Sequence, residues 1–301
     1  MTDRPEDRFS GHESFICRYG WLPKVYRAVL QNRTILNKEL EAMHTLGIGR
    51  NMVKSIKFWG ESSGIIRPGE DGGHDHGPLG RLLMGPDGWD PYLERLESLW
   101  LIHWWLVSNA KLGAWSEVFG NSRLRRFDRK TLVDRLNVRG RDKTRPLASS
   151  TLEQHAGILL QSYLKDERSN DDTSWCPLQD LSLLMQTVTD DGRVAFNVSN
   201  RQPLGLTERT FAVCLLDFVR RRSADQANLA LSDVSRGDFA PGTVLCIDEL
   251  TIRRYLDELA NGLLAGCLRF NDTADTQSIV VNLNNAPNHL ILATDAEVSN
   301  V

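Results

Sequence analysis

The chain has 301 residues, of which 41% are hydrophobic and 25% charged, and its formal net charge is -3. This length accommodates two or three domains with cores of their own, and the composition excludes a chain that is disordered over a large part. The isoelectric point near 6.2 excludes a protein that coats DNA through bulk positive charge, so any nucleic-acid binding must depend on local basic patches.

The cysteines, the first residues and the apolar segments indicate the cellular compartment in which we expect the protein. The five cysteines include no CxxC pair, which favours a reducing cytoplasm and argues against a disulfide framework or a structural zinc site. The first residues are polar and acidic, so we expect no signal peptide. The most apolar run, residues 99–107, is much shorter than the ~20 residues that cross a bilayer, and it therefore predicts a buried helix and no membrane contact.

A polar cluster precedes the first predicted helix. His12 and Glu13 could form an acid/base pair, but neighbouring residues of an extended segment point in opposite directions. We therefore favour a structural role, in which their side chains cap or bond nearby backbone. The helix that follows carries an apolar stripe, expected to close a three-helix core, made of Trp21, Leu22, Val25 and Val29.

Residues 36–83 predict two short helices around a glycine turn, followed by a β-hairpin wing. The first of these helices is expected over 37–45, with Asn37 as its N-cap and Leu40 and Met43 pointing inward. Gly47 and Gly49 interrupt the helical pattern, as a tight turn between two helices requires.

The next helix is expected to start at Arg50 and to end near Gly60. Its inward face is predicted by apolar residues at offsets of three and four: Met52, Val53, Ile56 and Trp59. The opposite face has the composition of a helix that reads the major groove, with cations for phosphates and Asn and Arg for base edges. The candidate DNA contacts there are Arg50, Asn51, Lys54, Ser55 and Lys57. Such units also serve as packing modules or protein contacts, so this alternative stays open.

The predicted wing and the helix after it contain the candidate metal ligands. His74 and His76 lie in a glycine-rich loop expected over 69–77, but they lack a third ligand, so we expect a solvated loop and no metal. From about Tyr92, apolar residues cover nearly the whole circumference of a helix, which predicts a central position. His103 lies within this run and is expected to be a hydrogen-bonded core residue.

The strongest charge signal lies in residues 122–145, where ten cations and three aspartates give a local net charge of +7. Phosphate contact requires such segregated charge, because each neutralised phosphate releases a counterion. The alternative is a solvated connector between domains, and a basic connector can also lie along a DNA backbone. The ten cations are Arg123, Arg125, Arg126, Arg129, Lys130, Arg135, Arg139, Arg141, Lys143 and Arg145, of which we expect Arg123, Arg125, Arg126, Arg129, Lys130, Arg139 and Arg141 to contact DNA.

The second half predicts helices over 152–164, 176–187, 207–222 and 249–260, with a strand over 193–198. Asp248 is expected to cap the last of these helices, and Leu250 to point inward. A short helix is expected over 229–234, and a hairpin over 266–270 and 279–283 follows the last helix. Because this second winged unit is less basic than the first, we assign it to protein contact or dimerisation.

Together these patterns predict a mainly α protein with small β-hairpin wings, in which tandem winged helix-turn-helix-like domains are joined by a helical middle. The expected divisions are an N-terminal winged domain over 1–120 with a Trp-rich buried helix, a basic connector over 121–149, and a helical and winged domain over 150–301.

A resemblance to a known family rests on five stretches, which read FSGHESF, RYGWLPK, LGIGRNMVKSIKFWGESSGII, GPLGRLL and DPYLERLESLWLIHWWL. They resemble the bacterial domain-of-unknown-function family numbered 4007, collinearly over about the first half of the chain. The second half matches more loosely, mainly in CPLQDL and in the helix near Asp248. Where the family is expected to read LTPLGRLL, this chain reads HGPLGRLL.

The resemblance implies a DNA-modification or anti-phage defence context, because members are often encoded beside genes resembling phosphoadenosine phosphosulfate reductases, cysteine desulfurases and ATPases of DNA phosphorothioation systems. It supplies no catalytic residues and no cofactor. Double-stranded DNA and sulfurtransferase-like or ATPase-like proteins are the expected partners, and a homodimer stays an open alternative.

Three hypotheses follow. The first is a non-enzymatic DNA-binding subunit that targets a modification complex, and the second is an adaptor whose winged domains bind only proteins. The third is a DNA-acting enzyme, although the sequence contains no phosphate-binding GxxxxGK[ST] loop and no CxxC redox pair. Cys17, near Arg18 and His12, is the one thiol whose pKa its neighbours could lower, but a buried inert cysteine is the favoured interpretation.

Overall fold

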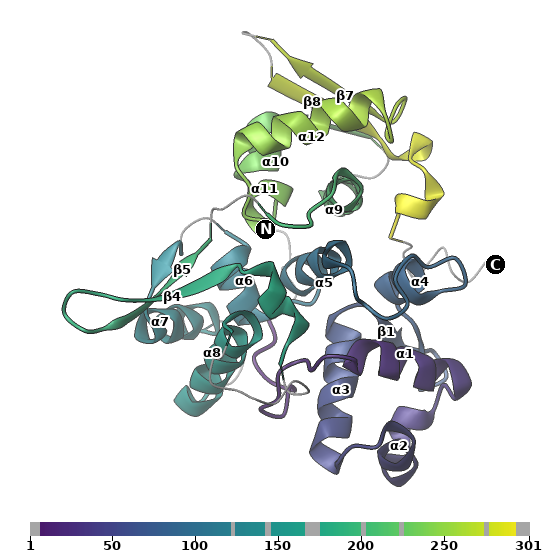
Figure 1. Cartoon of the computed structure of the whole chain (residues 1–301), viewed down its shortest axis with the longest axis vertical. Coiled ribbons are helices and arrows are strands. Elements are labelled where there is room, and N and C mark those ends of the chain that lie inside the picture. Colours follow the sequence, from purple (N-terminus) through teal and green to yellow (C-terminus); the bar gives the residue numbers. More distant parts are fainter. Residues whose placement is uncertain are drawn as a thin grey trace.

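The computed structural model describes residues 7–121, 124–141, 146–165, 175–199, 203–222, 226–273 and 277–292. In these residues the fold is mainly helical with small antiparallel sheets. Three groups of elements surround helix α5 (Leu96–Ser108), as Figure 1 shows: the N-terminal group and the middle group lie on either side of it, and the C-terminal group lies against its remaining face.

The N-terminal group begins with three helices and a hairpin. Helix α1 lies against both α2 and α3, and the strand pair that follows α3 aligns Ile66 with His76 in an antiparallel register. A short helix, α4, then leads to α5. The elements are α1 (Trp21–Gln31), the 3-10 helix η1 (Ile35–Asn37), α2 (Glu39–Leu46), α3 (Arg50–Ser62), β1 (Ile66–Pro68), β2 (His74–His76) and α4 (Pro78–Met84).

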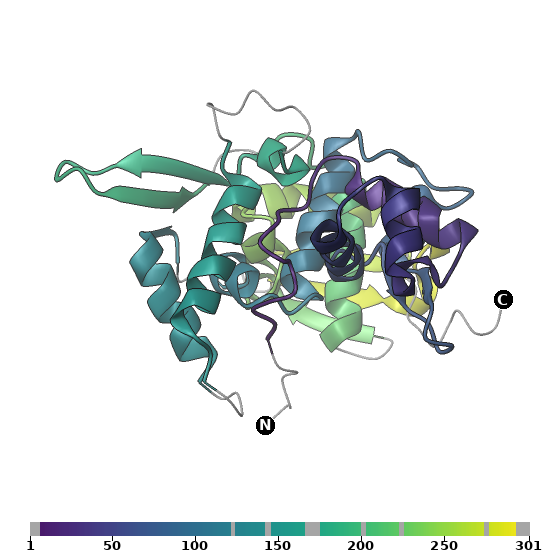
Figure 2. The same ribbon diagram turned by 90° about the horizontal axis from the view of Figure 1, so that it is seen from below.

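The middle group combines helices with a three-stranded sheet of order β3-β5-β4. Helix α8 packs against α7, and the hairpin formed by β4 and β5 projects from the body of the molecule (Figure 2). The elements are α6 (Gly113–Phe119), β3 (Arg126–Phe127), α7 (Arg129–Arg139), α8 (Ser149–Tyr163), η2 (Pro177–Leu181), β4 (Leu184–Val188) and β5 (Val194–Val198).

The C-terminal group packs α9 and α12 against each other beside a second antiparallel sheet, of order β6-β8-β7. The Asp248 carboxylate caps α12 by accepting a hydrogen bond from the Thr251 amide at 2.7 Å, as the sequence predicts. The elements are α9 (Glu208–Arg222), β6 (Gln226–Ala230), α10 (Leu231–Ser235), α11 (Pro241–Val244), α12 (Glu249–Asn261), β7 (Leu268–Asp272), β8 (Gln277–Asn282), η3 (Leu283–Asn285) and η4 (Asn288–Leu290).

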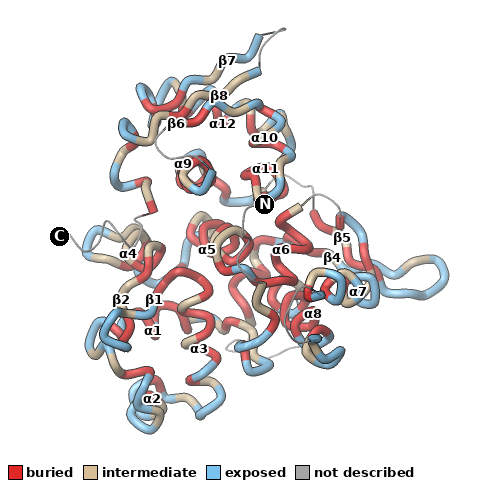
Figure 3. Tube along the Cα trace, turned by 180° about the vertical axis from the view of Figure 1, so that it is seen from behind, coloured by how far each residue is buried: buried red, intermediate tan, exposed pale blue. Residues whose placement is uncertain are grey.

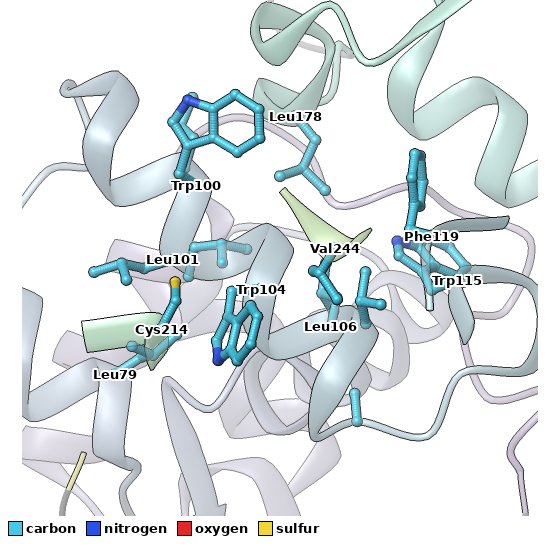
Figure 4. Packing of buried hydrophobic residues seen from close by; sticks show 14 of the residues in the cluster. Leu79, Trp100, Leu101, Trp104, Leu106, Trp115, Phe119, Leu178, Cys214 and Val244 are labelled. Atoms are coloured by element: carbon cyan, nitrogen blue, oxygen red, sulfur yellow. The ribbon is translucent and has the colours of Figure 1, made fainter. Parts of the chain in front are cut away.

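Helix α5 forms the centre of the core, because its apolar side chains cover its whole circumference. Trp100, Leu101 and Trp104 are completely buried, and Figures 3 and 4 show this helix enclosed by the other groups. In the described part of the chain, no helix combines the length and apolar character that crossing a membrane requires.

His103 confirms the prediction of a hydrogen-bonded core histidine. Its Nδ1 lies 2.7 Å from the hydroxyl of Tyr163 on α8, and its Nε2 lies 2.8 Å from the carbonyl oxygen of Val244 on α11. Trp115 Nε1 donates to the same tyrosine oxygen at 3.1 Å. The side-chain nitrogens of His103 and Trp115 and the Tyr163 hydroxyl therefore all have partners, and the cluster joins α5 to the middle and C-terminal groups.

Several predicted elements differ from the structure. Residues 176–187 form η2 and β4 rather than a helix, and the short helix expected at 229 begins only at Leu231, after strand β6. Leu40 and Leu250 are exposed rather than inward. Strands β4 and β6 form by pairing with other strands, and the exposure of the two leucines depends on how each helix is rotated about its axis. Periodicity within a segment determines neither.

The predictions of where the helices of the first unit begin and end also need correction. Asn37 belongs to η1 and donates its side-chain amide to the carbonyl oxygen of Gly72, so it does not cap α2. Helix α3 continues through Gly60 and is followed by Gly64, whose φ is 69°. Gly60 allows a close helix contact instead, because a Cβ there would lie 2.9 Å from Ile66 Cγ1 and 3.1 Å from Val25 Cγ1.

Candidate nucleic-acid interface

The exposed side of α3 carries cations. The helix starts after Gly49, whose backbone is extended, and it buries Val53, Ile56 and Trp59 toward the rest of the N-terminal group. Packing of this apolar face leaves the opposite side open to solvent. Arg50, Asn51 and Lys54 are exposed and Lys57 is half-buried.

Ser55 is not part of this surface, so its prediction as a DNA contact is wrong. The side chain is completely buried, and its hydroxyl donates to the carbonyl oxygen of His12 at 3.0 Å. In a helix, position 55 lies next to the buried residues 56 and 59, and the outward polar face is narrower than the sequence indicates. Ser55 instead fixes the N-terminal segment to α3.

Acidic side chains partly balance the cations of α3. Arg50 Nε lies 2.6 Å from Glu39 Oε1 on α2, and both side chains are largely exposed. Solvent-exposed pairs of this kind contribute little to folding stability, so Arg50 can exchange its carboxylate for a phosphate at low cost. The pairing nevertheless lowers the local positive potential around the helix start.

The β1–β2 hairpin is held against the helices and has an acidic tip. Arg33 forms ion pairs with Asp71 at 3.1 Å and with Asp75 at 2.7 Å. His74 is buried, and its Nε2 lies 3.1 Å from Glu61 Oε1, so the expected solvated loop over 69–77 is wrong for β2. The hairpin presents carboxylates rather than cations, and we assign it no phosphate contact.

The basic stretch after residue 121 folds into β3 and α7 rather than into an extended connector. The Asp128 carboxylate caps α7 by accepting from the Thr131 amide at 2.7 Å, and these hydrogen bonds hold the pKa of Asp128 below its usual value. The helix packs on α8 through Leu132 and Leu136. Five of the predicted DNA contacts are exposed here: Arg125, Arg126, Arg129, Lys130 and Arg141.

Two further arginines of this stretch form ion pairs within the fold. Arg139 is partly buried and bonds Asp7 as well as Glu117, the latter at 3.4 Å, and Arg135 also pairs with Glu117 at 3.0 Å. These arginines connect α7 to α6 and the N-terminal segment, so Arg139 as a DNA contact is wrong. Arg123 lies outside the described residues.

The C-terminal helix α12 carries arginines that are paired within their own unit. Arg253 bonds Glu249 at 2.9 Å and also contacts Asp272, and Arg254 bonds Glu258 at 3.2 Å. This face therefore offers little unbalanced positive charge.

A loop at residues 11–15 lies between α3 and α8, the helix on which α7 packs. Ser55 holds it to α3, and on its other side the Gln154 side-chain amide donates to the Ser14 hydroxyl. The N-terminal segment accordingly runs between α3 and α8 in Figures 1 and 2. Glu13 and Ser14 have φ values of 49° and 65°, a left-handed conformation that costs non-glycine residues energy.

A pair of buried histidines lies under this loop. His12 Nε2 and His155 Nδ1 are 3.4 Å apart, and both side chains are almost completely buried. Burial lowers the pKa of His12 to about 4 and that of His155 to about 3, so both rings are neutral near pH 7. The sequence singles out His12, but nothing local marks His155 as its partner, since 143 residues separate them.

Cys17 is not an activated thiol. It is buried, and desolvation raises its pKa well above the usual value, with a further contribution from nearby Cys176. The inert buried cysteine favoured from the sequence is confirmed.

Comparison with known proteins gives one family and two similar solved structures. The model of the family described as "Protein of unknown function (DUF4007)" matches residues 9–294. A structure titled "Magnesium ion-bound SspB crystal structure" is 25% identical with a TM-score of 0.82, and one titled "SspB crystal structure" is 25% identical with a TM-score of 0.79. Each comparison covers 93% of this chain and 84% of the other chain. No curated protein matches the chain.

Proposed function

The chain belongs to the family described as protein of unknown function (DUF4007), and we propose that it is a DNA-binding accessory subunit that positions a bacterial DNA-modification or anti-phage defence complex. The observation that carries this proposal is the pair of exposed cationic surfaces, one on α3 and the other on β3–α7. In a protein of net charge -3, two such surfaces favour a polyanionic ligand.

The order of elements supports a winged helix-turn-helix interpretation of the N-terminal group. Helices α2 and α3 meet at the Gly47–Gly49 turn, α1 packs across both, and the β1–β2 hairpin follows. In such units the second helix of the pair enters the major groove with its N-terminal residues at the base edges. Arg50, Asn51 and Lys54 occupy those positions on α3.

The C-terminal group supports a second winged unit with a different role. The chain order α9, β6, α10, α11, α12, β7, β8 and the sheet order β6-β8-β7 fit a winged helix. Because the arginines of α12 are paired with neighbouring carboxylates, we assign this unit to protein contact, with the sulfurtransferase-like or ATPase-like subunits of the complex as expected partners.

A metal ion does not enter this proposal. One similar structure is titled as magnesium-bound, but the described residues of this chain bring together no group of three or more His, Cys, Asp and Glu side chains suited to a metal ion. We therefore derive no step through a metal.

A protein-only adaptor is the second candidate, and the projecting β4–β5 hairpin favours it. Val188 and Val194 are cross-strand partners near its tip, with 67% and 42% of their surfaces exposed. An exposed valine pair on a projecting ribbon suits contact with another protein better than contact with phosphates.

Duplex binding by variants of α3 tests the proposal. In a fluorescence-anisotropy titration, Arg50→Ala with Lys54→Ala should weaken binding by about tenfold and reduce the salt slope by about 1.8, the value for two lost phosphate contacts. The matched control is Arg236→Ala with Arg254→Ala, which removes two exposed cations from the C-terminal group and should leave binding unchanged.

The alternatives give different results. Wild-type affinity and salt slope in the α3 double variant would overturn the assignment of α3 as a DNA-contacting surface. Absence of duplex binding by the wild-type protein at low salt, together with a stable complex between the protein and a modification subunit, would favour the adaptor instead.

A further inference from the structure

The two buried histidines form part of a continuous hydrogen-bonded row. The Ser14 amide donates to His12 Nδ1 at 3.3 Å, and the Ala114 amide donates to His155 Nε2 at 3.1 Å. The remaining two nitrogens, His12 Nε2 and His155 Nδ1, face each other across 3.4 Å. The ring planes differ by 14° and the centroids are 5.5 Å apart, so the two rings meet edge to edge.

Two ring hydrogens compete for the single gap between His12 and His155, which has room for only one of them. A neutral imidazole carries one ring hydrogen, and the nitrogen that accepts a backbone N–H cannot carry it. Both hydrogens are therefore directed into the same gap between the rings, where one would form an N–H···N bond and two repel each other. Protonation of either ring adds another donor and makes the conflict worse.

Of the two backbone amides that donate to the histidines, the Ser14 amide is the one that can move away. The Ala114 amide is fixed in the first turn of α6, whereas the Ser14 amide makes the longer bond from a turn with two consecutive left-handed residues. Glu13 and Ser14 are exposed, so this turn can move without opening the core. Once the Ser14 amide moves away, the His12 hydrogen can occupy Nδ1, and His155 Nδ1 then donates to His12 Nε2 without conflict.

We propose that His12 Nδ1–H, freed in this way, binds a non-bridging oxygen of the nucleic-acid backbone, and that His155 is a positioning residue that fixes the required tautomer of His12. This inference rests on the proposed function and extends the DNA-contacting surface to the 11–15 loop. Donors for the same phosphate group lie at this surface on Ser14 and Gln154, which already contact each other, and Lys54 adds positive charge from α3. The loop thereby extends the surface from the cations of α3 to α8, the helix on which α7 packs.

Two substitutions at one position separate binding from packing. The amide nitrogen of asparagine can occupy the place of Nδ1, whereas that of glutamine reaches the place of Nε2. His12→Asn should bind duplex within about threefold of wild type, and His12→Gln should lose about tenfold, the loss for one hydrogen bond to a charged group. Thermal unfolding provides the folding control, because both variants remove the same buried ring. Equal affinities of two folded variants would overturn the inference.

The tautomer of His12 gives a second readout, through nitrogen chemical shifts of protein labelled with ¹⁵N-histidine. Saturating duplex should move the His12 hydrogen from Nε2 to Nδ1, and inorganic phosphate at matched ionic strength distinguishes a general phosphate site from one that needs the polymer. A shift with either ligand supports the contact with a phosphate oxygen. Duplex binding that depends on Arg50 without a tautomer shift would overturn this inference and leave the proposed function standing, whereas absence of duplex binding would overturn both.

Discussion

Trp104 Nε1 donates a hydrogen bond to Asp217 Oδ2 at 2.8 Å, which joins α5 to α9 in the interior of the protein. The same carboxylate, 3% exposed, also accepts from Asn109 at 3.2 Å, Arg220 at 3.2 Å and Arg221 at 3.1 Å. A buried carboxylate with four donors is fully compensated. The C-terminal group is thus attached to the central helix by a polar network as well as by apolar packing.

Asp217→Ala should therefore destabilise the protein. The substitution removes the acceptor of the Trp104 indole N–H and the carboxylate that balances the charge of two arginines. Such a loss costs about 3 to 5 kcal/mol for a fully buried pair and about 2 to 4 kcal/mol here, because both arginines partly reach solvent. Urea denaturation gives the free energy of unfolding. Asp190→Ala on the exposed β4–β5 turn is the control and should change it by less than about 0.5 kcal/mol; a similar small change for Asp217→Ala would contradict the network's role.

The arginines of α7 should separate into two classes. Arg126→Ala with Lys130→Ala removes exposed cations, so duplex affinity and its salt slope should fall, the slope by about 1.8, while thermal unfolding stays unchanged. Arg139→Ala breaks the bonds to Asp7 and Glu117, so it should lower the stability by about 1 to 3 kcal/mol and leave the salt slope as in wild type. A reversed pattern would mean that the exposed and structural cations have been assigned to the wrong roles.

Two glycines inside helices should respond to alanine with opposite signs. Alanine gains about 1 kcal/mol in helix propensity at either site. At Gly60 the new Cβ would lie 2.9 Å from Ile66 Cγ1 between α3 and β1, and overpacking should outweigh the gain, with a net loss of about 1 to 2 kcal/mol. At Gly157 in α8 the nearest atom is the end of the flexible Arg129 side chain at 3.0 Å, so the gain should persist. Stabilisation of both variants in urea denaturation would show that the α3 contact is not tight.

Helices with long apolar periodicity could be predicted from the sequence because the signal lies within each segment. The all-round apolar pattern of α5, the position of α9 and the Asp248 cap of α12 needed no knowledge of distant residues. Strand β6 could not be predicted in this way, since it gains its hydrogen bonds only by pairing with β8, some fifty residues later in the chain. The predictions made from the sequence were therefore wrong mainly where an element depends on pairing with a distant segment.

The candidate interface shows the same limit. Composition locates the cations of α3 and α7, but it does not distinguish Lys54, which is exposed, from Ser55, which is buried one residue later. Nor does it show that Glu117 engages Arg139, because that contact requires α6 and α7 to be packed together. The His12–His155 pair likewise arises only after α8 has packed beside the N-terminal segment.

Three buried neutral histidines should make the protein sensitive to mild acid. Burial lowers the pKa of His12 and His103 to about 4 and that of His155 to about 3, whereas an unfolded histidine titrates near 6.5. The unfolded state binds more protons in this interval, so the free energy of unfolding is fully retained above about pH 6.5 and falls as the pH approaches 4. Each group contributes a loss of about 2 kcal/mol between pH 7 and pH 5.

Urea denaturation at several pH values between 7 and 5 measures this loss, in a range where most carboxylates keep their charge. His103→Gln removes one titrating group, so the variant should be less stable at pH 7 but should show a shallower dependence on pH than wild type. His44→Gln, at an exposed position on α2, is the matched control and should keep the wild-type slope. An unchanged slope in His103→Gln would mean that His103 does not remain neutral inside the fold, and the hydrogen bonds to Tyr163 and Val244 would then need a different proton assignment.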